Sequence, residues 1–314
     1  MKFGSVVALA FGLGVVSASP VVEKRASTSD KATVGYATLS GGTTGGGSAS
    51  PVTVTTLAAL KTALASGGKV VIISGTITGN EVVKVPSSTT VLGKSGATLT
   101  GVGLRVNEVS NVIIRNLKIN KVLASAGDAL GIQAANRVWV DSVELWSDRD
   151  HDKDYYDGLL DITHGCYAVS VTNSYLRDHW KGSLVGHSDS NESEDKAIQV
   201  TYAFNKWSNL NSRTPSFRFG HGHIFNNYFV GNNDGINTRL GAQLLVQNNV
   251  FENVKQPLYA TDGGYANASG NDFGGASNTA PSTSWNSVGY SYSLQPVTSV
   301  KSLTNSNAGA KLSF

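Results

Sequence analysis

Acidic residues concentrate in one short stretch of the chain. Eight of the 22 Asp and Glu residues fall between Asp141 and Asp161. We interpret the part from Asp148 to Asp154 as a solvated acidic loop. Asp157 and Asp161 differ, because Asp161 adjoins an apolar run, and a carboxylate beside apolar side chains is unfavourable unless its charge is neutralised. These two carboxylates are therefore candidates for binding a cation.

Oxygen ligands without a neighbouring His or Cys indicate a hard cation. Calcium accepts roughly six to eight oxygen ligands in flexible geometry. Asp128, which follows a glycine about thirty residues before Asp157, could supply a third carboxylate. The sequence therefore predicts a calcium site formed by Asp128, Asp157 and Asp161.

Basic residues follow the acidic stretch. Lys181 lies in the segment Asp-His-Trp-Lys, and Arg213 and Arg218 lie on either side of Thr-Pro-Ser-Phe. If these segments lie beside the acidic one, a calcium site and a basic patch share one groove, which suits a polyanion whose charge is carried by carboxylates. Arginine can bind a carboxylate with two parallel hydrogen bonds, and lysine adds a point charge. The alternative is that each residue forms an ordinary surface ion pair.

The histidines allow a competing interpretation. His221 and His223 alternate on a predicted strand and would face the same way, but no convincing third zinc ligand stands nearby. His179, Trp180 and His187 could line sugar-binding subsites, or they could be turn and packing residues.

Asparagine and aromatic residues recur at a fixed spacing in the second half of the chain. Four asparagines stand 22 residues apart, and each is followed two residues later by an aromatic residue: Asn205, Asn227, Asn249 and Asn271, then Trp207, Phe229, Phe251 and Phe273. Such a repeat, made of short strands without a recurring helix, predicts a parallel β-helix with three strands in each coil. At about 4.7 to 4.9 Å between coils, the asparagines could form a hydrogen-bonded ladder and the aromatic rings could stack inside. We expect these asparagines to occupy left-handed turn positions, which asparagine tolerates.

One amphipathic segment precedes the strands. Residues 56–65 place apolar side chains on one helical face, with Thr55 or Thr56 available as N-cap and the pair Gly67 and Gly68 as the stop. We expect this helix to cap one end of the solenoid and to cover its exposed strand edge. The Gly-, Ser- and Thr-rich segment 26–51 is predicted to be an extended wrap. Short strands are expected at 69–74, 81–85, 89–92, 103–106, 112–114, 138–140 and 169–171.

The overall composition agrees with an all-β protein. The 35 glycines against 7 prolines, with abundant Ser, Thr, Asn and Val, favour short strands and tight turns over long helices. With 15% charged and 40% hydrophobic residues, the chain is neither a charged disordered tail nor a collagen or coiled coil. A chain of 314 residues can bury a large core without disulfides, and its single cysteine, Cys166, is interpreted as a small buried hydrophobic residue.

The N-terminus has the pattern of a secretory signal peptide. Lys2 precedes an apolar run that is too short to span a bilayer and is followed by small residues. The basic pair of Lys24 and Arg25 predicts a second cut, so we assign residues 1–25 to a signal peptide and short pro-segment and residues 26–314 to a single β-helix domain. Removing three basic residues and one acidic residue lowers the formal net charge from +3 to +1, which indicates neither a nucleic-acid nor a membrane partner. We therefore expect a secreted, extracellular monomer.

Two sequons could carry N-linked glycans in a secretory pathway. They are Asn191-Glu192-Ser193 and Asn267-Ala268-Ser269. Both are predicted to lie in surface loops.

The motifs together resemble those of the extracellular pectate lyases, and the similarity is close to secreted fungal members. It extends over roughly residues 52–275 and rests on five segments in the family's order. The segments are Val138-Trp139-Val140-Asp141, Asp157-Gly158-Leu159-Leu160-Asp161, Asp178-His179-Trp180-Lys181, Gly186-His187-Ser188-Asp189, and Arg213-Thr214-Pro215 through Arg218.

This resemblance implies a right-handed parallel β-helix that cleaves de-esterified polygalacturonate by β-elimination with calcium. It also implies roles for individual positions. Asp128, Asp157 and Asp161 resemble the calcium ligands, Lys181 and Arg218 the residues that bind substrate carboxylates, and Arg213 the base. Free arginine has a pKa of about 12.5 to 13.8, so nearby cations and alkaline conditions would be needed to favour its neutral form.

Two positions depart from the family pattern. Ser142 stands where many members have His, which would change a structural hydrogen bond. Ala126 stands where some members have an additional acid, so calcium binding would have one protein ligand fewer and would depend more on the substrate.

Three rival functions remain to be weighed. A pectin lyase would act on methyl-esterified polymer without calcium, and the retained aspartates count against it. A β-helical polygalacturonase would use carboxylates as acid and base, but then Lys181, Arg213 and Arg218 would have no role. A solenoid adhesin or wall-binding protein would have no catalytic activity, and an assay for an unsaturated product would distinguish it from a lyase.

Overall fold

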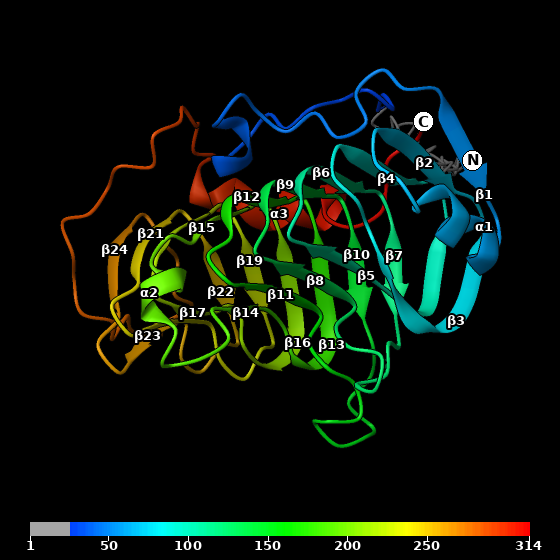
Figure 1. The fold of residues 1–314 in the computed structure, drawn as a ribbon. Coiled ribbons are helices and arrows are strands. Elements are labelled where there is room, and N and C mark those ends of the chain that lie inside the picture. The colour runs from blue at the N-terminus through cyan, green and yellow to red at the C-terminus, as the bar shows by residue number, and fades with distance from the viewer. Residues whose placement is uncertain (1–25) are drawn as a thin grey trace, which may run out of the picture.

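The computed structural model describes residues 26–314. The predicted signal peptide and pro-segment, residues 1–25, lie outside the described residues. In the described part, short parallel strands wind into an elongated coil, with β1 at one end and β24 at the other (Figure 1). No helix among these residues has both the length and the apolar character needed to cross a membrane.

One face of the coil is a ten-stranded parallel sheet. Its order, β1-β2-β4-β6-β9-β12-β15-β18-β21-β24, contains strands far apart in sequence, because each coil contributes one strand. Its strands are β1 (Pro51–Val54), β2 (Lys69–Ile73), β4 (Thr89–Gly93), β6 (Ser110–Arg115), β9 (Asn136–Asp141), β12 (Tyr167–Thr172), β15 (Gln199–Ala203), β18 (His221–Phe225), β21 (Gln243–Gln247) and β24 (Tyr265–Ser269).

The other two faces belong to one 14-stranded sheet, because the long strand β5 takes part in both. On one side of β5 the sheet runs β7-β10-β13-β16-β19-β22, and on the other side β8-β11-β14-β17-β20-β23, while β3 pairs with β5. These strands are β3 (Thr76–Lys84), β5 (Thr98–Asn107), β7 (Lys118–Asn120), β8 (Leu130–Gln133), β10 (Glu144–Trp146), β11 (Leu160–Thr163), β13 (Tyr175–Lys181), β14 (Leu184–Val185), β16 (Lys206–Ser212), β17 (Ser216–Arg218), β19 (Tyr228–Val230), β20 (Ile236–Arg239), β22 (Val250–Glu252) and β23 (Leu258–Thr261). The predicted three-sheet parallel β-helix is therefore confirmed.

The predicted asparagine ladder is present. Asn205 Nδ2 donates to Asn227 Oδ1 at 3.0 Å, Asn227 Nδ2 donates to Asn249 Oδ1 at 2.9 Å, and Asn249 Nδ2 donates to Asn271 Oδ1 at 2.9 Å. The backbone N–H of each of the first three also donates to the Oδ1 of the next asparagine. The ladder thus satisfies the polar groups of Asn205, Asn227 and Asn249, whose side chains are fully buried.

The expected conformation of these asparagines is wrong. The left-handed residue is the one immediately before each ladder position: Phe204 with φ 61°, Asn226 with φ 52°, Asn248 with φ 49° and Gly270 with φ 65°. The preceding residue makes the bend, which leaves the ladder asparagine free to direct its amide along the axis of the coil.

The aromatic residues of the repeat stack inside the coil. Trp207 and Phe229 have ring centroids 5.7 Å apart and nearly parallel planes, and Phe229 and Phe251 lie 4.6 Å apart. Phe273 follows at 5.5 Å from Phe251 in a tilted arrangement. The stack is part of one continuous hydrophobic core that runs from the first strands to the last.

The predicted helix is confirmed as α1 (Leu57–Ala63). The hydroxyl oxygen of Thr56 accepts the N–H of Ala59, as expected of an N-cap, and the helix contacts β1, β2 and β3 at the end of the coil. Two further helices, α2 (Glu192–Asp195) and α3 (Val297–Asn307), were not predicted.

The N-terminal and C-terminal segments run along the outside of the coil. The predicted wrap contains a single 3-10 turn, η1 (Tyr36–Thr38), and otherwise lacks regular structure up to β1. The C-terminal chain passes over the later coils and forms α3, whose Val300 packs against Tyr228 and Val250. The residues after α3 return to the first coils, where Ser313 accepts the N–H of Ala26 (Figure 1). Cys166 is fully buried, as predicted, and burial raises the pKa of its thiol to about 12.

Candidate active site

The three predicted calcium ligands lie on two neighbouring coils. Asp128 precedes β8, Asp157 precedes β11, and Asp161 is within β11, where it stands opposite Gly131 of β8. The backbone N–H of Gly158 donates to Asp128 Oδ1 at 3.1 Å, which fixes the orientation of that carboxylate. The parallel pairing of β8 with β11 therefore brings residues some thirty positions apart into one site.

The carboxylates of this site influence one another. Burial, and then the carboxylate of Asp128, raises the pKa of Asp161 well above its usual value. Burial, and then the carboxylate of Asp157, raises the pKa of Asp128 in the same way. Burial and a neighbouring carboxylate thus disfavour the charged forms of Asp128 and Asp161, and a bound cation would favour them.

Each of the three carboxylates faces a cationic side chain. This alternation of charges follows from the register of neighbouring coils, because Lys181 of β13 stands opposite Ser212 of β16, directly before Arg213. The shortest contacts are 3.7 Å from Arg105 Nη2 to Asp128 Oδ2, 3.3 Å from Lys181 Nζ to Asp157 Oδ1, and 3.8 Å from Arg213 Nη1 to Asp161 Oδ2. The predicted juxtaposition of an acidic and a basic group in one place is thus observed.

The residues fit a hard cation through their chemistry. All three side chains offer oxygen donors, and two of them are destabilised in the charged form. Across residues 26–314, however, no three His, Cys, Asp or Glu side chains converge as a ready-made metal site. The oxygen donors and the raised pKa values of Asp128 and Asp161, rather than a finished coordination geometry, are the features that fit a hard cation.

Lys181 is held in a narrow setting between a strand and a loop. Its side chain is 12% exposed, and its Nζ lies 3.3 Å from both Asp154 Oδ1 and Asp157 Oδ1. The backbone N–H of Lys181 donates to Nδ1 of His179 at 2.9 Å, and His179 is buried. His179 therefore supports the backbone at Lys181 and does not line a sugar-binding surface.

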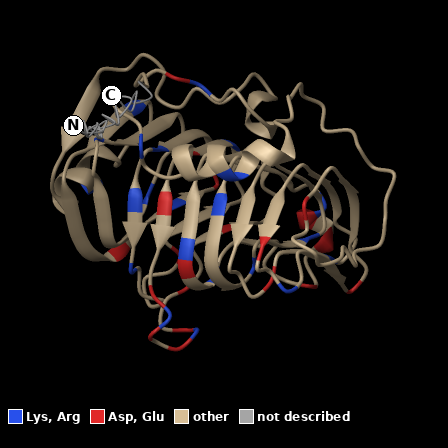
Figure 2. Ribbon diagram, turned by 180° about the vertical axis from the view of Figure 1, so that it is seen from behind, with Lys and Arg blue, Asp and Glu red and all other residues tan. Residues whose placement is uncertain are grey.

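The loop that carries Asp154 projects from the coil between β10 and β11, and Figure 2 shows its mixture of acidic and basic residues at the lower edge. Unlike the freely solvated loop that the sequence predicted, this loop is held by contacts within itself and with β13. Asp148 accepts a hydrogen bond from the Tyr156 hydroxyl at 2.9 Å and contacts the His151 ring, and the Trp180 indole donates to the His151 carbonyl at 2.8 Å. These contacts attach the loop to the strand that ends in Lys181.

Arg213 occupies an uncommon backbone conformation at the turn after β16. Its φ is 62°, in the left-handed region, which costs an L-residue roughly 1 to 2 kcal/mol. Its carbonyl accepts the N–H of Ser183 from the preceding coil at 2.6 Å, so that coil holds the strained residue in place. The side chain remains 31% exposed and reaches toward Asp161.

Arg218 lies apart from the three aspartates. At the end of β17, its Nε donates to Asp189 Oδ1 at 2.5 Å and its Nη1 to the Gly186 carbonyl at 2.9 Å. Arg239 from the next coil stands opposite Arg218 and contacts the same Asp189 at 3.4 Å. The groups predicted to act together therefore form two sets on the same sheet, one around Asp161 and one around Asp189.

Two cationic residues of this region were missed in the sequence. Arg239 follows Arg218 by 21 residues, nearly one repeat, and that spacing could have identified it. Arg105 precedes Asp128 by 23 residues, a comparable interval.

The expectation that both sequons lie in surface loops is wrong for one of them. Asn191 is in the turn before α2, where its Nδ2 donates to Glu194 Oε2 at 2.7 Å. Asn267 instead lies within β24, and its Nδ2 donates to the Trp285 carbonyl at 3.2 Å. Neither predicted glycan is tested by these positions.

The alternative zinc site is excluded by the partners of His223. Its two ring nitrogens lie 2.7 Å from the Tyr290 hydroxyl and 3.1 Å from Gln247 Oε1. The ring of His221 instead faces Trp285, with centroids 4.8 Å apart.

Comparisons with known proteins agree with this arrangement. A family described as "Pectate lyase" matches residues 9–313. "Pectate lyase A" of Aspergillus niger is 51% identical, over 98% of this chain and 96% of the relative. "Probable pectate lyase A" of Aspergillus fumigatus is 54% identical over the full length of both chains.

Solved structures give the same result for the fold. A pectate lyase from Bacillus sp. N165, in complex with trigalacturonate, has a TM-score of 0.77 and 29% identity over 88% of this chain and 98% of its own. Pectate lyase II from Xanthomonas campestris has a TM-score of 0.78 and 29% identity over 89% of this chain and 98% of its own. The right-handed β-helix and the polysaccharide lyase class predicted from sequence are confirmed. The chain therefore belongs to the pectate lyase family.

Proposed function

We propose that this pectate lyase cleaves de-esterified (1→4)-α-D-galacturonan by calcium-dependent β-elimination. The observation that carries the proposal is the alternation of Asp128, Asp157 and Asp161 with Arg105, Lys181 and Arg213 at 3.3 to 3.8 Å. A polymer with one carboxylate per sugar would be recognised by the cations and repelled by the aspartates unless a further cation lies between them. The Bacillus relative in complex with trigalacturonate supports the same substrate class.

The chemical step removes the proton at C5 of a galacturonate and breaks the bond between C4 and the glycosidic oxygen. The electron pair of the C5–H bond forms the C4=C5 double bond, and the departing oxygen takes up a proton. In this scheme Arg213 accepts the C5 proton, which requires the neutral guanidine and favours alkaline solution. The product carries a 4,5-unsaturated sugar at its new non-reducing end.

Fixed positive charge stabilises the enolate-like transition state. Lys181, which Asp154 and Asp157 hold in place, and Arg218, which Asp189 holds in place, bind substrate carboxylates without reorganising during the reaction. Asp128, Asp157 and Asp161 would hold the calcium ion. When bound, calcium would withdraw electron density from a substrate carboxylate and so make the C5 proton more acidic.

The same proposal includes the setting of the reaction. We infer that residues 1–25 direct secretion and are removed, that the enzyme acts outside the cell as a monomer, and that Asn191 and Asn267 are candidate glycan sites. The pattern of the N-terminal sequence and the two sequons support this part.

The deciding experiment follows the ultraviolet absorbance of the unsaturated product on polygalacturonate and on methyl-esterified pectin. Chelation should abolish the signal on polygalacturonate, and added calcium should restore it. Asp157→Ala should lose calcium-dependent activity, whereas Asp154→Ala, which removes the other 3.3 Å partner of Lys181, should stay within a few-fold of the unmodified enzyme.

Three outcomes would contradict the proposal. Full activity in chelator would remove the calcium role, and a preference for the esterified polymer would indicate a pectin lyase. Cleavage without an absorbing product would indicate a hydrolase.

A further inference from the structure

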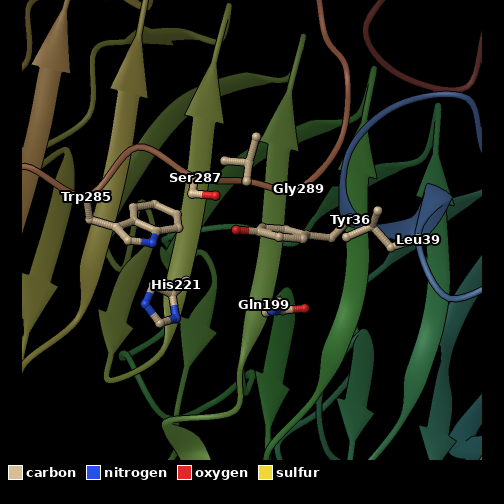
Figure 3. Close-up of a pocket in the computed structure, with 8 residues that line it drawn as sticks. Tyr36, Leu39, Gln199, His221, Trp285, Ser287 and Gly289 are labelled. Carbon is tan, nitrogen blue, oxygen red and sulfur yellow. The ribbon is translucent and has the colours of Figure 1, made fainter.

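A pocket lies on the ten-stranded face of the coil. Its floor is formed by the first residues of β15 and β18, Gln199 and His221, which stand opposite each other in the sheet. The N-terminal wrap and the C-terminal chain form its walls (Figure 3). The residues around it that carry polar or aromatic groups are Tyr36, Gln199, His221, Trp285 and Ser287, and the cavity measures about 210 Å³.

This pocket is distinct from the candidate active site. Arg218 ends β17 on the 14-stranded sheet, and the chain then bends through two residues before His221 begins β18 on the ten-stranded sheet. The pocket is therefore separated from the groove of Arg218 by one bend of the coil, and none of the proposed catalytic residues contributes to it.

The walls of the pocket are held in place before any ligand arrives. The hydroxyl of Tyr290 lies 2.7 Å from Thr201 Oγ1 and 2.7 Å from His223 Nδ1, which fastens the C-terminal chain to β15 and β18. The ring of Tyr36 packs edge-to-face on that of Tyr290 at 5.1 Å between centroids. Because these contacts fix both walls, binding there would require little ordering of the protein.

The polar groups in the pocket are not used by the fold. Tyr36 is 2% exposed, yet its hydroxyl has no hydrogen-bond partner within residues 26–314, and Figure 3 shows it directed toward Ser287 and Trp285. Burial raises the pKa of Tyr36, so this hydroxyl remains a donor at any physiological pH. Burial also lowers the pKa of His221, so its ring is uncharged at neutral pH. The Tyr36 hydroxyl is therefore free to bond to a ligand that enters the pocket.

The composition of the lining restricts the ligand. It contains no Lys, Arg, Asp or Glu, so a galacturonate carboxylate would lose its hydration without gaining an ion pair. Trp285 offers an aromatic surface, while Tyr36, Gln199 and His221 offer donors and acceptors that match hydroxyl groups. The volume is below the roughly 300 to 1,000 Å³ usual for drug-sized ligands, which suits a single sugar ring.

We propose that this pocket binds one neutral sugar residue and serves as a second carbohydrate site, separate from the active site. The apolar C–H face of the sugar would pack against Trp285, and its hydroxyls would bond to Tyr36, Gln199 and His221. Neutral residues occur as branches on wall polysaccharides, so the pocket would hold the enzyme to branched regions of its polymer. This inference does not depend on the identity of the catalytic residues.

Binding can be measured without any enzymatic activity. The probes are methyl β-D-galactopyranoside and methyl β-D-galactopyranosiduronate, which differ chiefly in the charge at C6, and the readout is saturation-transfer NMR of the probe protons in chelator. The neutral glycoside should bind saturably with a Kd on the order of 1 to 10 mM, and the charged one at least tenfold more weakly.

Variants locate the binding. Trp285→Ala and, as a second variant at the other wall, His221→Ala should each weaken the neutral probe at least fivefold, and Trp285→Phe should restore part of the loss. Tyr265→Ala is the matched control, because Tyr265 is an exposed aromatic residue of β24 that does not line the pocket. Thermal midpoints measured in parallel show whether each variant is folded.

A second readout uses the polymer. On galactan-branched pectin, Trp285→Ala should raise KM several-fold with kcat unchanged, and on unbranched polygalacturonate both constants should stay the same. The proposal is overturned if the neutral probe does not bind, if the charged probe binds equally well, if trigalacturonate with calcium displaces the neutral probe, or if Tyr265→Ala weakens it as much as Trp285→Ala.

Discussion

Replacing Arg213 by lysine separates a catalytic base from a residue that only binds the substrate. Both side chains are cations, so a residue that clamps a carboxylate would be partly replaced. A base must instead bring a nitrogen within roughly 2.6 to 3.2 Å of the C5 carbon that loses its proton. Lysine ends about one bond short of the terminal guanidinium nitrogens, and a misplacement of about 1 Å can cost on the order of a hundredfold in rate.

The structure limits the other effects of this substitution. The contact of Arg213 with Asp161 is 3.8 Å long, and the arginine side chain is 31% exposed, so the ion pair contributes less than about 1 kcal/mol to stability. The left-handed backbone at this position is held by the Ser183 N–H and accepts lysine as readily as arginine. We therefore expect kcat to fall about a hundredfold, equivalent to about 2.7 kcal/mol in the barrier, with KM changed by less than about threefold.

The assay is the initial rate of unsaturated product formation at saturating calcium across a range of polygalacturonate concentrations. Arg105→Lys is the matched control, because Arg105 faces Asp128 at 3.7 Å, much as Arg213 faces Asp161, but has no proposed part in proton transfer. Near-normal kcat with a raised KM in Arg213→Lys would refute the assignment as base. Arg213 would then join Lys181 and Arg218 as a binding residue.

Three further predictions concern Lys181, the asparagine ladder and the buried His223. Lys181→Ala should raise KM for polygalacturonate at least tenfold with a smaller change in kcat, and an unchanged KM in steady-state assays would argue against its contact with substrate. Asn227→Ala should lower the free energy of unfolding by roughly 3 kcal/mol or more, because the buried amide groups of Asn205 and Asn249 lose their partner. Asn271→Ala, at the end of the ladder, should cost less, and denaturant titration of both variants checks this order. Burial lowers the pKa of His223 from 6.5 to about 4, so as pH falls the unfolded chain binds a proton before the folded protein does, and stability is lost from about pH 6.5 toward pH 4. His223→Gln should reduce the loss of stability between pH 7 and pH 5 by about 2 kcal/mol in denaturant titrations. An identical pH dependence in the two proteins would disprove the reasoning.

The solenoid was predictable because its repeat reports directly on three-dimensional contacts. Asn227 and Asn249 are 22 residues apart in sequence and hydrogen-bonded in space, so the regular spacing in the sequence identifies the residues that contact one another in neighbouring coils. Helix α3 was not predictable in this way. Its sequence is rich in Ser, Thr and Asn, which favour helices weakly, and it is stabilised by packing of Val300 against Tyr228 and Val250, which only the tertiary structure creates.

The candidate site was less predictable than the solenoid. The residue types of the acidic and basic clusters could be identified from the chain, but their pairings could not. Asp157 and Lys181 are 24 residues apart, whereas Asp189 and Arg218 are 29 apart, because loops of different lengths lie between the strands. Because this spacing varies with loop length, it does not show which residues of neighbouring coils stand opposite each other. Only the structure shows that Arg218 lies apart from the aspartates and that Arg239 contacts Asp189.

The division between core and surface explains how one coil supports both kinds of spacing. Side chains that point inward, such as Asn227 and Phe229, must repeat because each needs the identical group in the next coil to complete its hydrogen bonds or its stacking. Side chains that point outward need only a fixed backbone beneath them, which the parallel pairing of β8, β11 and β14 provides. Loops can therefore lengthen between coils without disturbing the ladder, and Asp161 and Arg213, 52 positions apart, still meet at 3.8 Å. Variation in loop length thus changes which groups face the substrate, while the inner repeat preserves the distance between them.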